Sequence, residues 1–215
     1  MEITEAFLRA GDHFEGLLDD PATVKCWEDP SALQDLTVGG LVVHVLQGLV
    51  WLERLVDAPA PADVPVIGAG ELTSSFKVAT SEDLQSETHR YVRNLAEHGA
   101  ARPAGATIAR FSEVVARLGK RLDREPADRL LDMRPTVPCA IRLDDRLRCE
   151  IVEFVVHGDD LAASIGQETL ELPAEAVTVA VGVLLDSARH GHGDRAVVRA
   201  LARRERATGE VFPVL

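Results

Sequence analysis

The chain has 215 residues and a formal net charge of −12, with 23 Lys and Arg against 35 Asp and Glu. Its hydrophobic fraction of 46% can fill the core of one domain, or of one domain with a small appendage. Phosphate binding needs a basic surface, so the acidic balance argues against DNA or RNA as a partner. No uninterrupted apolar run reaches the roughly 18 residues that cross a bilayer, and we expect no membrane partner.

The cysteines indicate a reducing compartment. Cys26, Cys139 and Cys149 are odd in number, widely spaced and form no CxxC pair. They are expected to be free thiols without a disulfide framework. The N-terminus also lacks the basic start of a signal peptide, so the sequence predicts a cytoplasmic protein.

The spacing of apolar residues predicts a protein built from helices. The expected helices, in chain order, are 3–18, 38–56, 80–98, 107–123, 144–166 and 174–189, followed by a basic helix within 195–215 that ends in an apolar tail. Thr37 is the expected N-cap of the second helix. Prolines break the chain at 58–65, and residues 130–143 are expected to be extended. The fold class is therefore all-α, with a helical bundle in residues 1–167 and a helical extension packed on it in 168–215.

The helix at 144–166 carries an unusual polar stripe. At about 100° per residue, Glu150, Glu153, His157 and Asp160 fall on one face. Apolar residues border this stripe on both sides, so it is expected to point inward: Val152, Val156, Phe154 and Leu161. Buried carboxylates and imidazoles are costly unless they are paired or bind a metal.

These residues favour a metal site. Glu153 and His157 stand at i, i+4, which lets both side chains reach one ion. His44 interrupts the apolar run 38–46 and can supply a third ligand from another helix. Two histidines and a carboxylate suit Zn²⁺ or Fe²⁺ with positions open for water or substrate. The alternative is that each is a core polar residue satisfied by hydrogen bonds, but three such residues in two apolar helices favour the ion.

Three segments carry a resemblance to a known family. The stretches 30–44 and 153–160, the latter with the pattern E-x3-H-x2-D, are similar to the mycothiol-dependent maleylpyruvate isomerase N-terminal family of the DinB-like superfamily. Residues 198–206 resemble the tail of many actinobacterial members. The resemblance implies a four-helix bundle and is compatible with a homodimer. It implies that His44, Glu153 and His157 bind the metal, usually Zn²⁺ with water completing the shell, and that Asp160 orients His157 or a water.

The resemblance also implies a chemistry. Better-known members use a low-molecular-weight thiol such as mycothiol or bacillithiol, and a bound ion lowers the pKa of such a thiol. The thiolate would add to a small electrophile, which predicts a thiol-dependent isomerase or S-transferase. The general base stays open between Asp160 and Glu150. Only residues 168–215 follow the bundle, whereas the isomerase proper has a larger C-terminal α/β domain, so the resemblance does not select one reaction.

Other assignments remain open at this stage. The chain can instead be a non-catalytic metal-binding module with a stress or regulatory role, and a closed coordination shell would favour that function. Arg199 and Arg203 belong to the basic C-terminal helix, where they can be solvated or can anchor the carboxylate of the thiol cofactor. The pair His190 and His192 is interpreted as solvated, and Cys149 as a small apolar residue.

Overall fold

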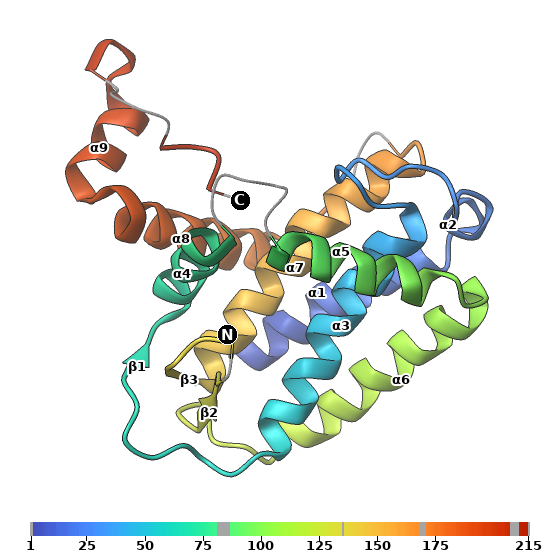
Figure 1. Cartoon of the computed structure of the whole chain (residues 1–215), viewed down its shortest axis with the longest axis horizontal. Coiled ribbons are helices and arrows are strands. Elements are labelled where there is room, and N and C mark those ends of the chain that lie inside the picture. Colours follow the sequence, from blue (N-terminus) through green and yellow to red (C-terminus); the bar gives the residue numbers. More distant parts are fainter. Residues whose placement is uncertain (1, 81–86, 135, 168–170, 207–210, 215) are drawn as a thin grey trace.

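The protein is mostly helical and carries one small sheet (Figure 1). A computed structural model describes residues 2–80, 87–134, 136–167, 171–206 and 211–214. This confirms the predicted helical class. The elements are α1 (Ile3–Leu18), α2 (Pro21–Lys25), α3 (Val38–Asp57), β1 (Val66–Ile67), α4 (Ala69–Thr80), α5 (Glu87–Ala100), α6 (Ala104–Leu122), β2 (Leu130–Asp132), β3 (Ala140–Arg142), α7 (Leu143–Ser164), α8 (Ala174–His192), α9 (Asp194–Ala202) and the 3-10 helix η1 (Arg204–Arg206).

The main core lies among α1, α3, α6 and α7. α1 and α3 each pack against both α6 and α7. Four phenylalanines, all fully buried, meet at the centre: Phe7, Phe14, Phe111 and Phe154. The ring of Phe14 lies 5.3 Å from that of Phe111 and 5.8 Å from that of Phe154, measured between centroids. This cluster fixes one face of α7 against α1 and α6 and leaves the neighbouring face toward α3.

Helix α3 begins as the sequence predicts. The side chain of Thr37 accepts a hydrogen bond from the backbone N–H of Gly40 at 3.0 Å, which confirms the N-cap. The carboxylate of Glu97, from α5, accepts a second bond from the backbone N–H of Thr37 at 2.7 Å. A carboxylate is favourable at a helix N-terminus, and this one ties α5 to the start of α3.

The apolar character of α3 bears on the expectation that the protein has no membrane partner. Polar residues interrupt its sequence, yet among the described residues it is the one helix long and apolar enough to cross a membrane. Within its most apolar stretch of 18 residues, 61% are buried inside the protein. α3 therefore has the burial of a core helix.

The sheet fixes the start of α7. β3 lies between β1, to which it is parallel, and β2, to which it is antiparallel. Ile141 pairs with Ile67 on one side and with Leu131 on the other. α7 begins directly after Arg142, the last residue of β3. The segment 130–143, predicted to be extended, thus contains β2 and β3. Residue 135 of this segment lies outside the described residues.

Two helices are absent from the sequence prediction. α2 is only five residues long, and α4 contains Gly70, Thr73, Ser74 and Ser75, whose helix propensity is low. α4 packs along α8, and this tertiary contact outweighs propensity. The approach is close: a Cβ at Gly70 would lie 2.5 Å from the Cβ of Asp186.

The C-terminal part differs from the expectation in its helix ends. α8 continues to His192, into the segment 190–194 that was expected to be a loop, and α9 ends at Ala202 rather than continuing as a longer basic helix. α8 contributes Ala176, Ala180 and Val183 to the main core. The end of α8, α9 and the tail form a second apolar cluster, made of Ala188, Val197, Val211 and Val214. Residues 81–86, 168–170, 207–210 and 215 of the predicted segments lie outside the described residues, and the division at 167 stays a prediction.

The phenylalanine cluster predicts a stability effect. Phe14→Ala should lower the free energy of unfolding by about 3–5 kcal/mol, because it removes a fully buried ring and leaves a cavity. Denaturant unfolding measures the loss. Leu201→Ala is the control, since Leu201 is 62% exposed and should change stability by no more than about 0.5 kcal/mol. Similar small losses in both variants would contradict the assigned core.

Candidate metal centre

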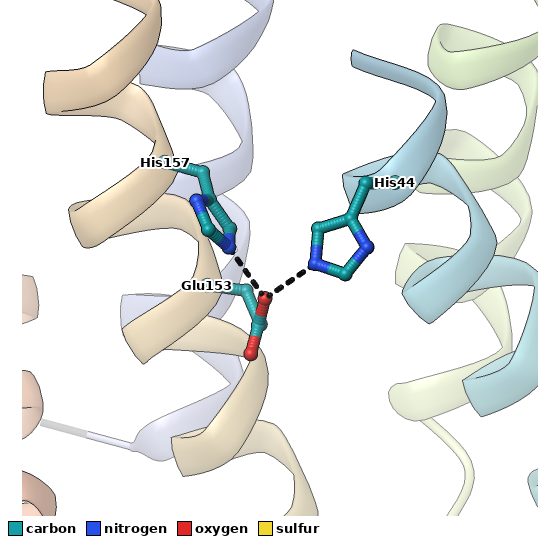
Figure 2. A group of neighbouring side chains, drawn as sticks. All are labelled: His44, Glu153 and His157. Carbon is teal, nitrogen blue, oxygen red and sulfur yellow. Dashed lines mark ion pairs between the residues drawn. The ribbon is translucent and has the colours of Figure 1, made fainter. Parts of the chain in front are cut away.

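Helices α3 and α7 bring three predicted residues together. His44 comes from α3, and Glu153 and His157 come from successive turns of α7 (Figure 2). One ligand atom from each residue lies within 4.8 Å of the other two. We call His44, Glu153 and His157 the His–Glu–His cluster. Among the described residues it is the one group of three or more His, Cys, Asp or Glu side chains with this geometry.

Both imidazoles point at the same carboxylate oxygen. The Nε2 atom of His157 lies 3.2 Å from Oε2 of Glu153, and Nε2 of His44 lies 3.6 Å from that oxygen (Figure 2). The two rings meet edge to face, with centroids 5.1 Å apart. Two nitrogens and one oxygen that converge from two helices form a donor set suited to a divalent ion.

Asp160 holds the far side of the His157 ring. Its Oδ2 atom lies 2.9 Å from Nδ1 of His157. A carboxylate at Nδ1 keeps a proton on that nitrogen, so the other nitrogen, Nε2, can present its lone pair to an ion. This geometry is compatible with the orienting role that the family resemblance implies for Asp160.

The cluster is strongly coupled in its protonation. Loss of solvent would raise the pKa of Glu153, but hydrogen bonds and charge from His157 and His44 hold that pKa well below its ordinary value. Burial lowers the pKa of His157, yet hydrogen bonds to Asp160 and Glu153 outweigh it and raise the pKa to about 9. The protein without an ion therefore holds a carboxylate beside an imidazolium. A divalent cation would take the place of the His157 Nε2 proton.

The polar stripe predicted on α7 is only partly inward. The side chains of Glu150 and His157 are 1% and 13% exposed, whereas those of Glu153 and Asp160 are 39% and 27% exposed. The outer part of the stripe is therefore open to water. Glu150 is paired with Arg146, whose Nη2 lies 2.5 Å from its Oε1. Arg146 was not singled out in the sequence, although its i, i+4 spacing to Glu150 was the available signal.

The other predicted residues lie elsewhere. Arg199 and Arg203 are on α9, which packs on α8 and projects beyond the end of that helix (Figure 1). The structure does not bring them to the His–Glu–His cluster, and their role as a cofactor anchor stays a prediction. His190 and His192 are exposed at the end of α8, in accord with solvated side chains.

The cysteines are all free thiols, as expected. Cys149 is buried on α7, and its Sγ lies 3.9 Å from the carbonyl oxygen of Ala69. Burial raises the pKa of Cys149 to about 12, so the thiol stays protonated at neutral pH. Cys149 is thus a packed core residue rather than a nucleophile.

Comparison with known families finds a match over most of the chain. The model of the mycothiol maleylpyruvate isomerase N-terminal domain matches residues 7–162, a range that includes α3 and α6 and most of α1 and α7. The chain belongs to this family. The match confirms the resemblance seen in the sequence and contains the whole His–Glu–His cluster. Comparisons with curated proteins and with solved structures find no match.

Removing any one side chain of the cluster should weaken metal binding. His44→Ala, Glu153→Ala and His157→Ala should each reduce the Zn²⁺ retained by the purified protein, because two donors hold an ion less firmly than three. Plasma emission spectrometry after gel filtration measures the retained metal. Matched controls are His190→Ala, which is exposed, and Glu113→Ala, whose side chain is 70% exposed. Equal metal content in cluster and control variants would show that the ion is held elsewhere.

The affinity for Zn²⁺ should depend on pH. In the metal-free protein the pKa of His157 is raised to about 9. Relative to the unfolded chain, in which the pKa has its ordinary value of 6.5, the imidazolium stabilises the metal-free fold fully below pH 6.5. This contribution is lost as the pH rises to 9. Zn²⁺ must displace the proton, so affinity should rise by about tenfold per pH unit over that window and then level off. Calorimetric titrations at several pH values test this. A flat profile between pH 6.5 and 9 would contradict the assignment of His157.

Proposed function

We propose that the protein is a metal-dependent enzyme that uses a low-molecular-weight thiol of the mycothiol type, and that it acts as an isomerase or S-transferase on a small electrophilic metabolite or xenobiotic. The observation that carries the proposal is the convergence of His44, Glu153 and His157 on one point. Membership of the family supports the connection to mycothiol.

The exposure of the cluster favours catalysis over a purely structural ion. Structural zinc sites take four protein ligands, whereas catalytic sites take three and leave a position for water or substrate. The described residues provide three ligand side chains, and that of Glu153 is 39% exposed. A small thiol can therefore approach from the solvent side.

Each residue has a defined task in this proposal. Nε2 of His44, Nε2 of His157 and a carboxylate oxygen of Glu153 would hold Zn²⁺ or another divalent ion. The bound ion would supply Lewis acidity that favours the deprotonated form of a thiol at neutral pH. Asp160 keeps the proton on Nδ1 of His157 and so fixes the direction of Nε2. Once the thiol has lost its proton to water, its sulfur could add to an electrophilic carbon, whose double bond opens and whose neighbouring atom takes up a proton from water.

The proposal extends to the setting of the site. We infer that α1, α3, α6 and α7, which pack in pairs around the main core, form the four-helix bundle of the family. The partners would be the thiol and the electrophile, with no nucleic acid or membrane. Three free cysteines and the family's thiol chemistry support a cytoplasmic setting.

Asp160→Asn should separate orientation from binding. The amide can still contact Nδ1 but no longer carries the charge that stabilises the protonated nitrogen, so the rate should fall by about 10–100-fold while much of the Zn²⁺ is retained. Steady-state assays with mycothiol and a panel of electrophiles, including maleylpyruvate, measure the rate. Asp159→Asn is the matched control, because Asp159 is adjacent and exposed, and it should leave the rate unchanged.

The same assay decides the class of protein. An enzyme of this kind should lose turnover when the metal is chelated and regain it when Zn²⁺ is added. Turnover should also require the thiol, both before chelation and after Zn²⁺ is restored. A protein that binds Zn²⁺ at the cluster but shows no thiol binding at millimolar concentration, and no turnover with any electrophile, would instead be a non-catalytic metal-binding module.

A further inference from the structure

A buried ion pair lies next to the His–Glu–His cluster. Arg146 and Glu150 precede Glu153 on α7, and the side chains of the pair are only 6% and 1% exposed. Nη2 of Arg146 lies 2.5 Å from Oε1 of Glu150. Removing two charges from water costs free energy that their attraction often only balances, so such a pair is weak evidence for a stabilising role. Its position beside the cluster indicates a different task.

Helix α3 shapes the space around the pair. The guanidinium carbon of Arg146 lies 5.1 Å from the centre of the Trp51 ring, a distance that allows a cation–π contact. One turn earlier on α3, Gly48 faces the Glu150 carboxylate, and a Cβ there would lie 3.2 Å from Oε2. The pair is thus enclosed by the same two helices that carry the His–Glu–His cluster.

Arg146 has two carboxylates within its electrostatic reach. Burial alone would lower the pKa of Arg146, but the charges of Glu150 and Glu153 both act on the guanidinium and raise it. The residues at i, i+4 and i+7 all lie on one face of a helix, so Arg146, Glu150 and Glu153 share a strip of α7. Within that strip the short contact is the one to Glu150. Glu153 is left to the two imidazoles.

We propose that Glu150 is a positioning residue of the metal centre, which holds the Arg146 guanidinium and so leaves the Glu153 carboxylate free to bind a divalent cation. The inference rests on the proposed function, because it takes the His–Glu–His cluster as the cation site. Without the negative charge of Glu150, Arg146 is a buried and unpaired cation. It would then turn toward Glu153, occupy its oxygens and repel the incoming ion.

A double-mutant cycle on the full chain tests this with Zn²⁺ alone as the probe. Glu150→Gln should weaken Zn²⁺ binding by about tenfold or more, since it leaves the Arg146 charge uncompensated. Arg146→Met combined with Glu150→Gln removes both charges and should restore an affinity close to that of the wild type. Arg146→Met alone should not weaken binding. Arg148→Met is the control, because Arg148 is on the same helix and is partly exposed. Its Nε lies 3.8 Å from Oδ1 of Asp145.

Two results would overturn the inference. One is a folded Glu150→Gln variant that binds Zn²⁺ as tightly as the wild type. The other is a double variant that binds as weakly as Glu150→Gln, which would make the loss of packing, not charge, the cause. Circular dichroism confirms folding, and Glu150→Asp replaces Glu150→Gln if the latter does not fold. Its shorter side chain retracts from Arg146, so it should also weaken binding, and unchanged affinity would again overturn the inference.

The same binding measurements distinguish a failure of the metal assignment from a failure of the role proposed for Glu150. If the wild-type protein binds no Zn²⁺, or if His44→Ala binds it as well as the wild type, the metal assignment fails and the inference about Glu150 fails with it. If the wild type binds Zn²⁺ and His44→Ala does not, but the Glu150 variants are unaffected, only the positioning role is excluded.

Discussion

The packing of α7 between two different environments is the constraint on which the site depends. On one face, the fully buried ring of Phe154 contacts the rings of Phe7 and Phe14 and locks the rotation of the helix. That rotation sets Glu153 and His157 toward α3, where His44 points back at them. A turn of α7 about its axis would separate the three donor atoms while the core lost its aromatic contacts. The core and the metal centre are therefore fixed by the same helix orientation.

The interface of α3 and α7 concentrates charge that would be costly if it were unpaired. Along it Arg146 pairs with Glu150, and His157 lies beside Asp160. The exposed fraction rises from the buried pair to Glu153, so the interior end is closed and the cluster is accessible. Such a gradient suits a site that binds a cation firmly and still admits a small molecule.

Sequence reasoning reached the residues of the cluster because their polar side chains interrupt strong apolar patterns in two long helices. It could not locate α4, since Gly70 and a run of Thr and Ser give a weak helical pattern, and the helix forms through contact with α8. The i, i+4 spacing of Arg146 and Glu150 was visible in the sequence, but the burial of the pair beside the ring of Trp51 was not, because Trp51 belongs to another helix. Sequence reasoning also extended the basic C-terminal helix too far, since the end of α9 at Ala202 carries no proline or glycine signal.

The most direct test of the account is a crystal structure of the zinc-loaded protein with anomalous diffraction at the zinc absorption edge. The account predicts one strong peak at the His–Glu–His cluster, about 2.0–2.2 Å from Nε2 of His44, Nε2 of His157 and an oxygen of Glu153. It also predicts that Arg146 stays paired with Glu150 when the ion is bound. A zinc ion held at another place, such as the exposed His190 and His192, would contradict the account if His44 and His157 still contacted Glu153 with no ion between them.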